Sequence, residues 1–99
     1  MQLIYRALDA YAHDADYIMH GNCSGADSLA GYWAEAAGIQ EIAMPANRSL
    51  YKNGAGYVRN RAMLALGPSL VITFPGGKGT AMMVRMAEQA GIPVINVVA

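Results

Sequence analysis

The sequence has few charged residues, a single cysteine and no long apolar run. Only 14% of its 99 residues are charged, and seven Lys and Arg balance seven Asp and Glu, so the formal net charge is zero. A protein that follows nucleic-acid phosphates normally carries a basic excess, so we do not expect general nucleic-acid binding. With Cys23 as the one cysteine, an internal disulfide is excluded.

Membrane and secretion signals are also missing. No stretch approaches the roughly 20 apolar residues that a membrane-spanning helix needs. The N-terminus lacks the apolar core of a signal peptide. We therefore expect a cytoplasmic protein with no membrane partner.

Apolar residues, by contrast, are abundant. They make up 55% of the chain, which excludes a disordered protein. The length fits one domain over residues 1–99. A surface with few charged residues also suits a chain that buries surface in a homo-dimer or a higher oligomer.

The hydrophobic pattern predicts alternating helices and strands. Helices are expected over residues 2–11, 25–37, 55–66 and 79–90, and strands over residues 17–20, 41–44, 70–74 and 94–98. The last two strands are almost continuous apolar runs, which is typical of parallel strands covered on both faces. The expected class is α/β, with a mostly parallel sheet of about four strands. Because ligands of such sheets bind at the carboxyl ends of the strands, the loops after those ends are the candidate site.

A glycine-rich loop follows the third expected strand. It runs through Pro75, Gly76, Gly77, Lys78, Gly79 and Thr80 into the fourth expected helix. Glycine allows a ligand close to the backbone, and the N–H groups that open a helix favour an anion. Lys78 or Thr80 would add a donor to a phosphate or a sugar. The alternative is a turn that needs glycine only for packing. The motif is neither a Walker A loop nor Gly-x-Gly-x-x-Gly.

A second loop has the same layout after the first expected strand. Its candidate residues are Gly21, Asn22, Ser24, Gly25 and Asp27. Asp27 would accept hydrogen bonds from ribose hydroxyls, or it would simply complete a capping box with Ser24. His20 and Cys23 form a weak candidate for a base and nucleophile, and His20 is better explained as a satisfied polar strand end. Because His13 lies far from His20 and there is no further cysteine, no metal site or cofactor is expected.

Basic residues gather in the stretch that runs from the second expected strand into the third expected helix. This stretch holds four of the seven, Arg48, Lys52, Arg59 and Arg61. Arg59, near the first turns of the helix, would face the ligand edge and bind phosphate with two parallel hydrogen bonds. A solvated basic face explains the other three.

Taken together, these stretches resemble the SLOG superfamily, in particular its small YspA-like branch of bacteria and phages. The matching residues are Gly21 to Asp27, Leu29-Ala30, Trp33-Ala34, Gly38-Ile39, Pro45-Ala46, Gly54 to Gly56, Arg59-Asn60, Met63-Leu64, Leu70 to Thr80, Met83 to Arg85 and Ala90 to Val94. The resemblance implies a Rossmann-like three-layer sandwich that binds a nucleotide or nucleotide-derived molecule through both glycine loops.

The chain departs from the superfamily in two places. Catalytic members, the phosphoribohydrolases, carry Pro-Gly-Gly-x-Gly-Thr-x-x-Glu, and the position of that glutamate is Met83 here. Arg59 still matches the catalytic arginine, but a glycosidase needs the carboxylate. The sequence also starts in what looks like the first helix, so we expect the first strand that relatives place in mid-sheet to be missing. Either the neighbouring strands pair directly, a partner chain fills the gap, or the chain is a remnant.

Three functions therefore stay open. The first is a non-enzymatic sensor or sequestering protein for a nucleotide-type ligand. The second is an N-glycosidase that resembles the phosphoribohydrolases, with Arg59 as its one assigned catalytic residue. The third is a shortened domain that acts through self-association.

Overall fold

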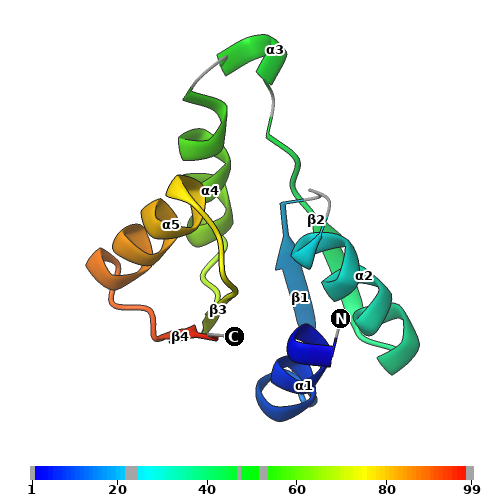
Figure 1. The fold of residues 1–99 in the computed structure, drawn as a ribbon. Helices are drawn as coiled ribbons and strands as arrows, with labels where there is room; N and C mark the ends of the chain where they lie inside the picture. Colours follow the sequence, from blue (N-terminus) through cyan, green and yellow to red (C-terminus); the bar gives the residue numbers. More distant parts are fainter. Residues whose placement is uncertain (1, 22–24, 47, 52–53, 98–99) are drawn as a thin grey trace. The chain divides into compact units, whose positions relative to one another are not determined.

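The computed structural model describes residues 2–21, 25–46, 48–51 and 54–97, and the side chains of Gln2, Arg48, Tyr51 and Lys78 lie outside that description. The chain divides into two compact units, Met1–Pro45 and Ala46–Ala99, which are described one at a time. The elements of the first unit are α1 (Gln2–Tyr11), β1 (Tyr17–His20), α2 (Ala26–Ala37) and β2 (Gln40–Ala43) (Figure 1). Those of the second are α3 (Arg48–Tyr51), α4 (Ala55–Ala65), β3 (Val71–Thr73), α5 (Lys78–Gln89) and β4 (Val94–Asn96).

Each unit contains a pair of parallel strands joined by a helix. Strand β1 pairs with β2, with His20 opposite Ala43, and β3 pairs with β4, with Thr73 opposite Asn96. The predicted α/β class and the parallel strand direction are therefore confirmed. The described strands form two two-stranded sheets, β1–β2 and β3–β4.

The same turn leads from the helix into the second strand in both units. Helix α2 ends at Gly38, which has φ 72°, and the N–H of Ile39 reaches back to the carbonyl of Ala34 at 2.9 Å. Past the end of α5, Gly91 has φ 75° and the N–H of Ile92 reaches the carbonyl of Ala87, also at 2.9 Å. This left-handed turn satisfies the last helical carbonyls and favours glycine because it has no Cβ.

The helices cover the strand pairs in the same way in both units. In the first, α2 packs on β1 and β2, and α1 packs on α2; in the second, α5 packs on β3 and β4, and α4 packs on α5. The expectation that the last two strands are buried on both faces is wrong. Of β3 and β4, Thr73 alone is buried, and Val71, Ile72, Val94 and Ile95 are half-buried. The reason is that β3 and β4 are only three residues long, so each presents few side chains that a helix can bury.

The element boundaries differ from expectation by only one or two residues, with one addition. Strand β2 begins at Gln40, one residue early, although the Met44 N–H still donates to the carbonyl of His20 at 2.8 Å. The short helix α3 was not expected. Four residues carry no helical periodicity that a sequence pattern can detect.

A hydrogen bond from a buried tryptophan joins α1 to α2. The indole Nε1 of Trp33, whose side chain is only 6% exposed, donates to Asp9 Oδ1 at 2.8 Å. A buried indole needs such a partner, because an unpaired N–H loses its bond to water on folding. The contact therefore fixes the register of α1 on α2.

We expect Asp9→Ala to lower the free energy of unfolding by about 1–3 kcal/mol, because the buried Trp33 N–H loses its acceptor. Urea unfolding followed by the fluorescence of Trp33, the one tryptophan of the chain, measures this loss. The exposed Asp14 provides the control, since Asp14→Ala should change stability by less than about 0.5 kcal/mol. Equal effects of the two substitutions would contradict the assigned role of the hydrogen bond.

Candidate functional site

The first glycine loop, residues 21–25, follows the carboxyl end of β1. Gly21 is buried directly after His20, Gly25 is the N-cap of α2, and Asp27 lies in the first helical turn. The predicted site residues Asn22 and Ser24, and also Cys23, lie outside the described residues. Gly21 and Gly25 are thus the described ends of the segment between β1 and α2, and Asp27 follows within α2.

The cap of α2 differs from the expected one. The N-cap residue is Gly25, which has no side chain for a capping hydrogen bond, and Ser24, the expected cap, lies outside the described residues. Gly25 has φ 81° and ψ −122°, a conformation that residues with a Cβ rarely adopt. Its carbonyl accepts the helical hydrogen bond from the N–H of Leu29 at 3.0 Å. The N-cap residue itself therefore supplies no side chain to the first backbone N–H groups of α2.

The second glycine loop, residues 75–79, follows β3 in the same manner. Pro75, Gly76, Gly77 and Gly79 are exposed, and Thr80 is half-buried in the first turn of α5. Gly77 is the N-cap, without a side-chain capping hydrogen bond, and its carbonyl accepts from the N–H of Ala81 at 3.2 Å. Lys78 opens the helix, but its side chain lies outside the description.

The three glycines of this loop differ in what surrounds them. A Cβ on Gly76 would collide with the Thr80 hydroxyl and would lie 3.3 Å from the Thr80 Cβ. A Cβ on Gly77 or Gly79 would meet nothing within 4 Å. Packing of Thr80 therefore explains why Gly76 is glycine, whereas no contact within the described chain explains Gly77 and Gly79.

Arg59 lies on α4, in the same unit as the second loop. Its Nε donates to Oδ1 of Asn60 at 3.0 Å, and Asn60 is only 3% exposed, so the base of the guanidinium is anchored to a buried amide. The neighbouring Arg61 is exposed and lies 5.8 Å above the ring of Tyr57 on the same helix. That cation–π contact agrees with the predicted surface role of Arg61.

Sequence reasoning missed how polar side chains join the strand ends in each unit. His20 Nε2 lies 2.6 Å from Glu41 Oε1, and the Thr73 hydroxyl donates to Asn96 Oδ1. The pairing of His20 with Glu41 follows from the register of β1 and β2. Because His20 pairs with Ala43 and side chains alternate along a strand, Glu41 lies on the same face as His20. His20 is a satisfied polar strand end, as the sequence favoured.

Two other kinds of site are absent from the described part of the chain. It contains no group of three or more His, Cys, Asp or Glu side chains placed to hold a metal ion. None of the helices over residues 2–21, 25–46, 48–51 and 54–97 is long and apolar enough to cross a membrane.

Comparison with known proteins agrees with the motifs. The model of the YspA, cpYpsA-related SLOG family matches residues 1–51, which include the first loop. The Gene 61 protein of Mycobacterium phage D29 is 33% identical over 103 residues, an alignment that covers 94% of this chain and 82% of that protein. No solved structure matches the chain. The chain belongs to the YspA, cpYpsA-related SLOG family.

Proposed function

We propose that this protein binds a nucleotide or a nucleotide-derived small molecule at its two glycine loops and acts as a sensor or a sequestering protein. Membership of the SLOG family indicates a nucleotide-related ligand in general. The finer assignment depends on one observation that recurs in both units. A parallel strand leads through a glycine loop into a helix whose N-cap is glycine.

This arrangement suits an anionic ligand. The first N–H groups of a helix have no partner within the helix, and the helix dipole places partial positive charge there. In proteins such groups bind phosphate when the preceding loop lets it approach the backbone. Gly77 and Gly79 leave open space at the start of α5. We assign the ligand contacts to Gly21, Gly25, Asp27, Pro75, Gly76, Gly77, Gly79 and Thr80, with Asn22, Ser24 and Lys78 retained from the sequence.

Arg59 is the proposed charged contact. A guanidinium offers five N–H donors, and the contact to Asn60 uses Nε, which holds the group in one orientation. A preorganised guanidinium loses less entropy when it binds a phosphate. Met83, half-buried on α5, stands where the hydrolytic relatives have glutamate, which supports binding over N-glycoside cleavage.

A thermal-shift screen with AMP, ADP-ribose, NAD and cyclic nucleotides tests the proposal. A ligand at 100 times its dissociation constant stabilises the folded state by about 2.7 kcal/mol, which corresponds to roughly 10 °C or more for a domain of this size. We expect Arg59→Ala to remove most of that shift, and the matched control Arg61→Ala to keep it. Absence of a shift with every nucleotide would overturn the proposal. Release of free base from AMP would show the alternative glycosidase activity instead.

A further inference from the structure

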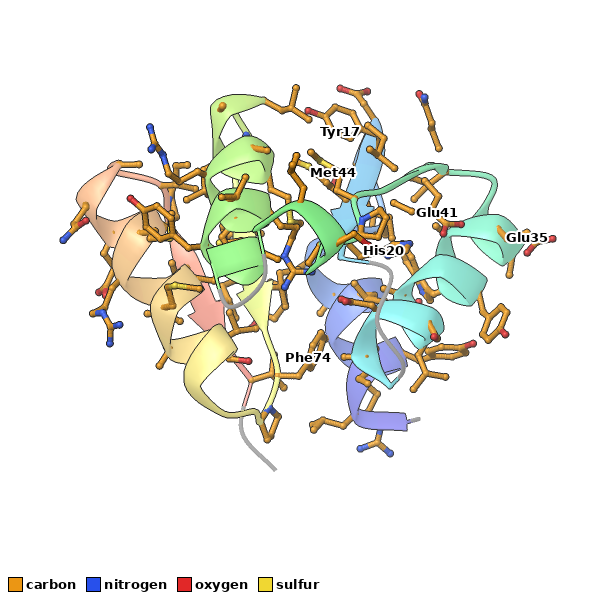
Figure 2. The ribbon with its side chains drawn as sticks, turned by 90° about the horizontal axis from the view of Figure 1, so that it is seen from above. Tyr17, His20, Glu35, Glu41, Met44 and Phe74 are labelled. Carbon is orange, nitrogen blue, oxygen red and sulfur yellow. The ribbon has the colours of Figure 1, made fainter. Side chains whose placement is uncertain are left out.

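A buried histidine marks the carboxyl end of β1. His20 is 6% exposed, and its Nε2 lies 2.6 Å from Oε1 of Glu41, whose side chain is 39% exposed. Figure 2 shows the two side chains side by side, with Glu35 of α2 away from them. Because a carboxylate oxygen accepts hydrogen bonds, Nε2 carries a proton in this contact. The hydrogen bond at one ring nitrogen decides which tautomer a neutral histidine adopts.

Helix α2 makes room for the carboxylate of Glu41. A Cβ on Gly31, in the middle of that helix, would lie 2.7 Å from Glu41 Oε1 and 3.1 Å from its Cδ. Real Cβ atoms do not approach other atoms so closely, so any side chain at position 31 would displace the carboxylate. Glycine in a helix interior is normally unfavourable, and its presence here is explained by the space that Glu41 occupies.

The contact joins the three elements around the first glycine loop. His20 belongs to β1, Glu41 to β2 and Gly31 to α2. His20 is also held through its backbone, since its carbonyl accepts from the N–H of Met44 at 2.8 Å. Gly21, the next residue, starts the loop, and Gly25 ends it at the N-cap of α2. The Glu41 carboxylate therefore contacts His20 of β1 and lies beside Gly31 of α2, and these are the two elements that the loop connects.

We propose that Glu41 is a positioning residue for Gly21 and Gly25, the two described ends of the first glycine loop. Its carboxylate holds His20 in the Nε2–H tautomer and fixes the end of β1 against α2, and Gly31 is glycine so that the carboxylate can sit there. This positioning role can be tested without a ligand. The consequence for affinity rests on the proposed function.

NMR spectroscopy of the whole chain tests the positioning role without a ligand. Long-range ¹H–¹⁵N spectra of the imidazole should show the Nε2–H tautomer of His20 in the wild type. We expect this signature to persist in Glu41→Gln, whose amide oxygen still accepts, and to be lost in Glu41→Ala and Gly31→Ala. The amide chemical shifts of Gly21 and Gly25 should change in the same two variants, Glu41→Ala and Gly31→Ala. Glu35→Ala, which removes an exposed carboxylate of α2, should change neither signal.

Each result has a defined meaning. An unchanged His20 tautomer or unchanged Gly21 and Gly25 amides in Glu41→Ala would overturn the positioning role, whatever any ligand does. If the wild type binds AMP, we expect Glu41→Ala to weaken the affinity about tenfold, or 1.4 kcal/mol, with recovery in Glu41→Gln. Unchanged affinity in Glu41→Ala would limit Glu41 to a purely structural contact and overturn the proposal. Lack of nucleotide binding by the wild type counts against the proposed function alone.

Discussion

Gly31→Ala should destabilise the protein by about 1–2 kcal/mol, although the same change inside a helix usually stabilises by about 0.5–1 kcal/mol. The usual gain arises because glycine loses more backbone freedom on folding than alanine does. Here the new methyl group would displace the Glu41 carboxylate, since the three atoms nearest to its position all belong to Glu41. The direction of the effect therefore depends on one side chain.

The expected magnitude follows from the cost of breaking the contact to His20. Glu41 can swing its flexible side chain away from the new methyl group, but His20 is buried and would lose its contact with the carboxylate. An unsatisfied buried polar group costs about 1–3 kcal/mol, and hydrogen bonds to charged groups are at the upper end. That loss exceeds the helical gain of the methyl group.

A double-mutant cycle isolates this effect. In the Glu41→Ala background the contact to His20 is already absent, so Gly31→Ala should stabilise by about 0.5–1 kcal/mol, and the coupling should be about 2 kcal/mol. Urea unfolding of the four proteins, followed by Trp33 fluorescence, gives all the required free energies. The idea fails if Gly31→Ala has the same sign in both backgrounds.

Local patterns were enough to predict the alternation of elements. The periodicity of residues 2–11 and the apolar run of residues 70–74 depend only on neighbours in the sequence, and both elements form in the structure. The turns at Gly38 and Gly91 are equally local, because positive φ favours glycine whatever surrounds it. The parallel pairing followed from strands that alternate with helices.

Contacts between distant residues could not be predicted in this way. His20 and Glu41 are 21 positions apart, and Trp33 and Asp9 are 24 apart. Their meeting depends on strand register and helix packing, which no local pattern contains. Gly31 is a local sign of the first contact, because a glycine inside a helix implies close approach of another group. The N-cap of α2 is not decided by the sequence, because serine and glycine, which stand at positions 24 and 25, are both common N-cap residues.

Gly79→Ala should separate folding from ligand binding more sharply than any other change in the second loop. Nothing lies within 4 Å of its Cβ position, and Gly79 is within helix α5, so alanine should stabilise the fold by about 0.5–1 kcal/mol. If phosphate approaches the backbone here, the same methyl group stands in its way, and the affinity should fall at least tenfold, or about 1.4 kcal/mol. A Gly79→Ala protein that is more stable but binds more weakly could not be explained by a packing role of Gly79, so the result would indicate ligand contact.

Gly77→Ala should weaken binding in a similar way, since nothing lies within 4 Å of its Cβ position. Gly76→Ala is less informative, because it forces the Thr80 side chain to move and so mixes folding with binding. Calorimetric titration with AMP and ADP-ribose, beside thermal unfolding of the free proteins, measures both quantities. Ser69→Ala, an exposed change just before β3, is the control that should alter neither. Undiminished affinity in both Gly77→Ala and Gly79→Ala would exclude ligand contact with the backbone of this loop.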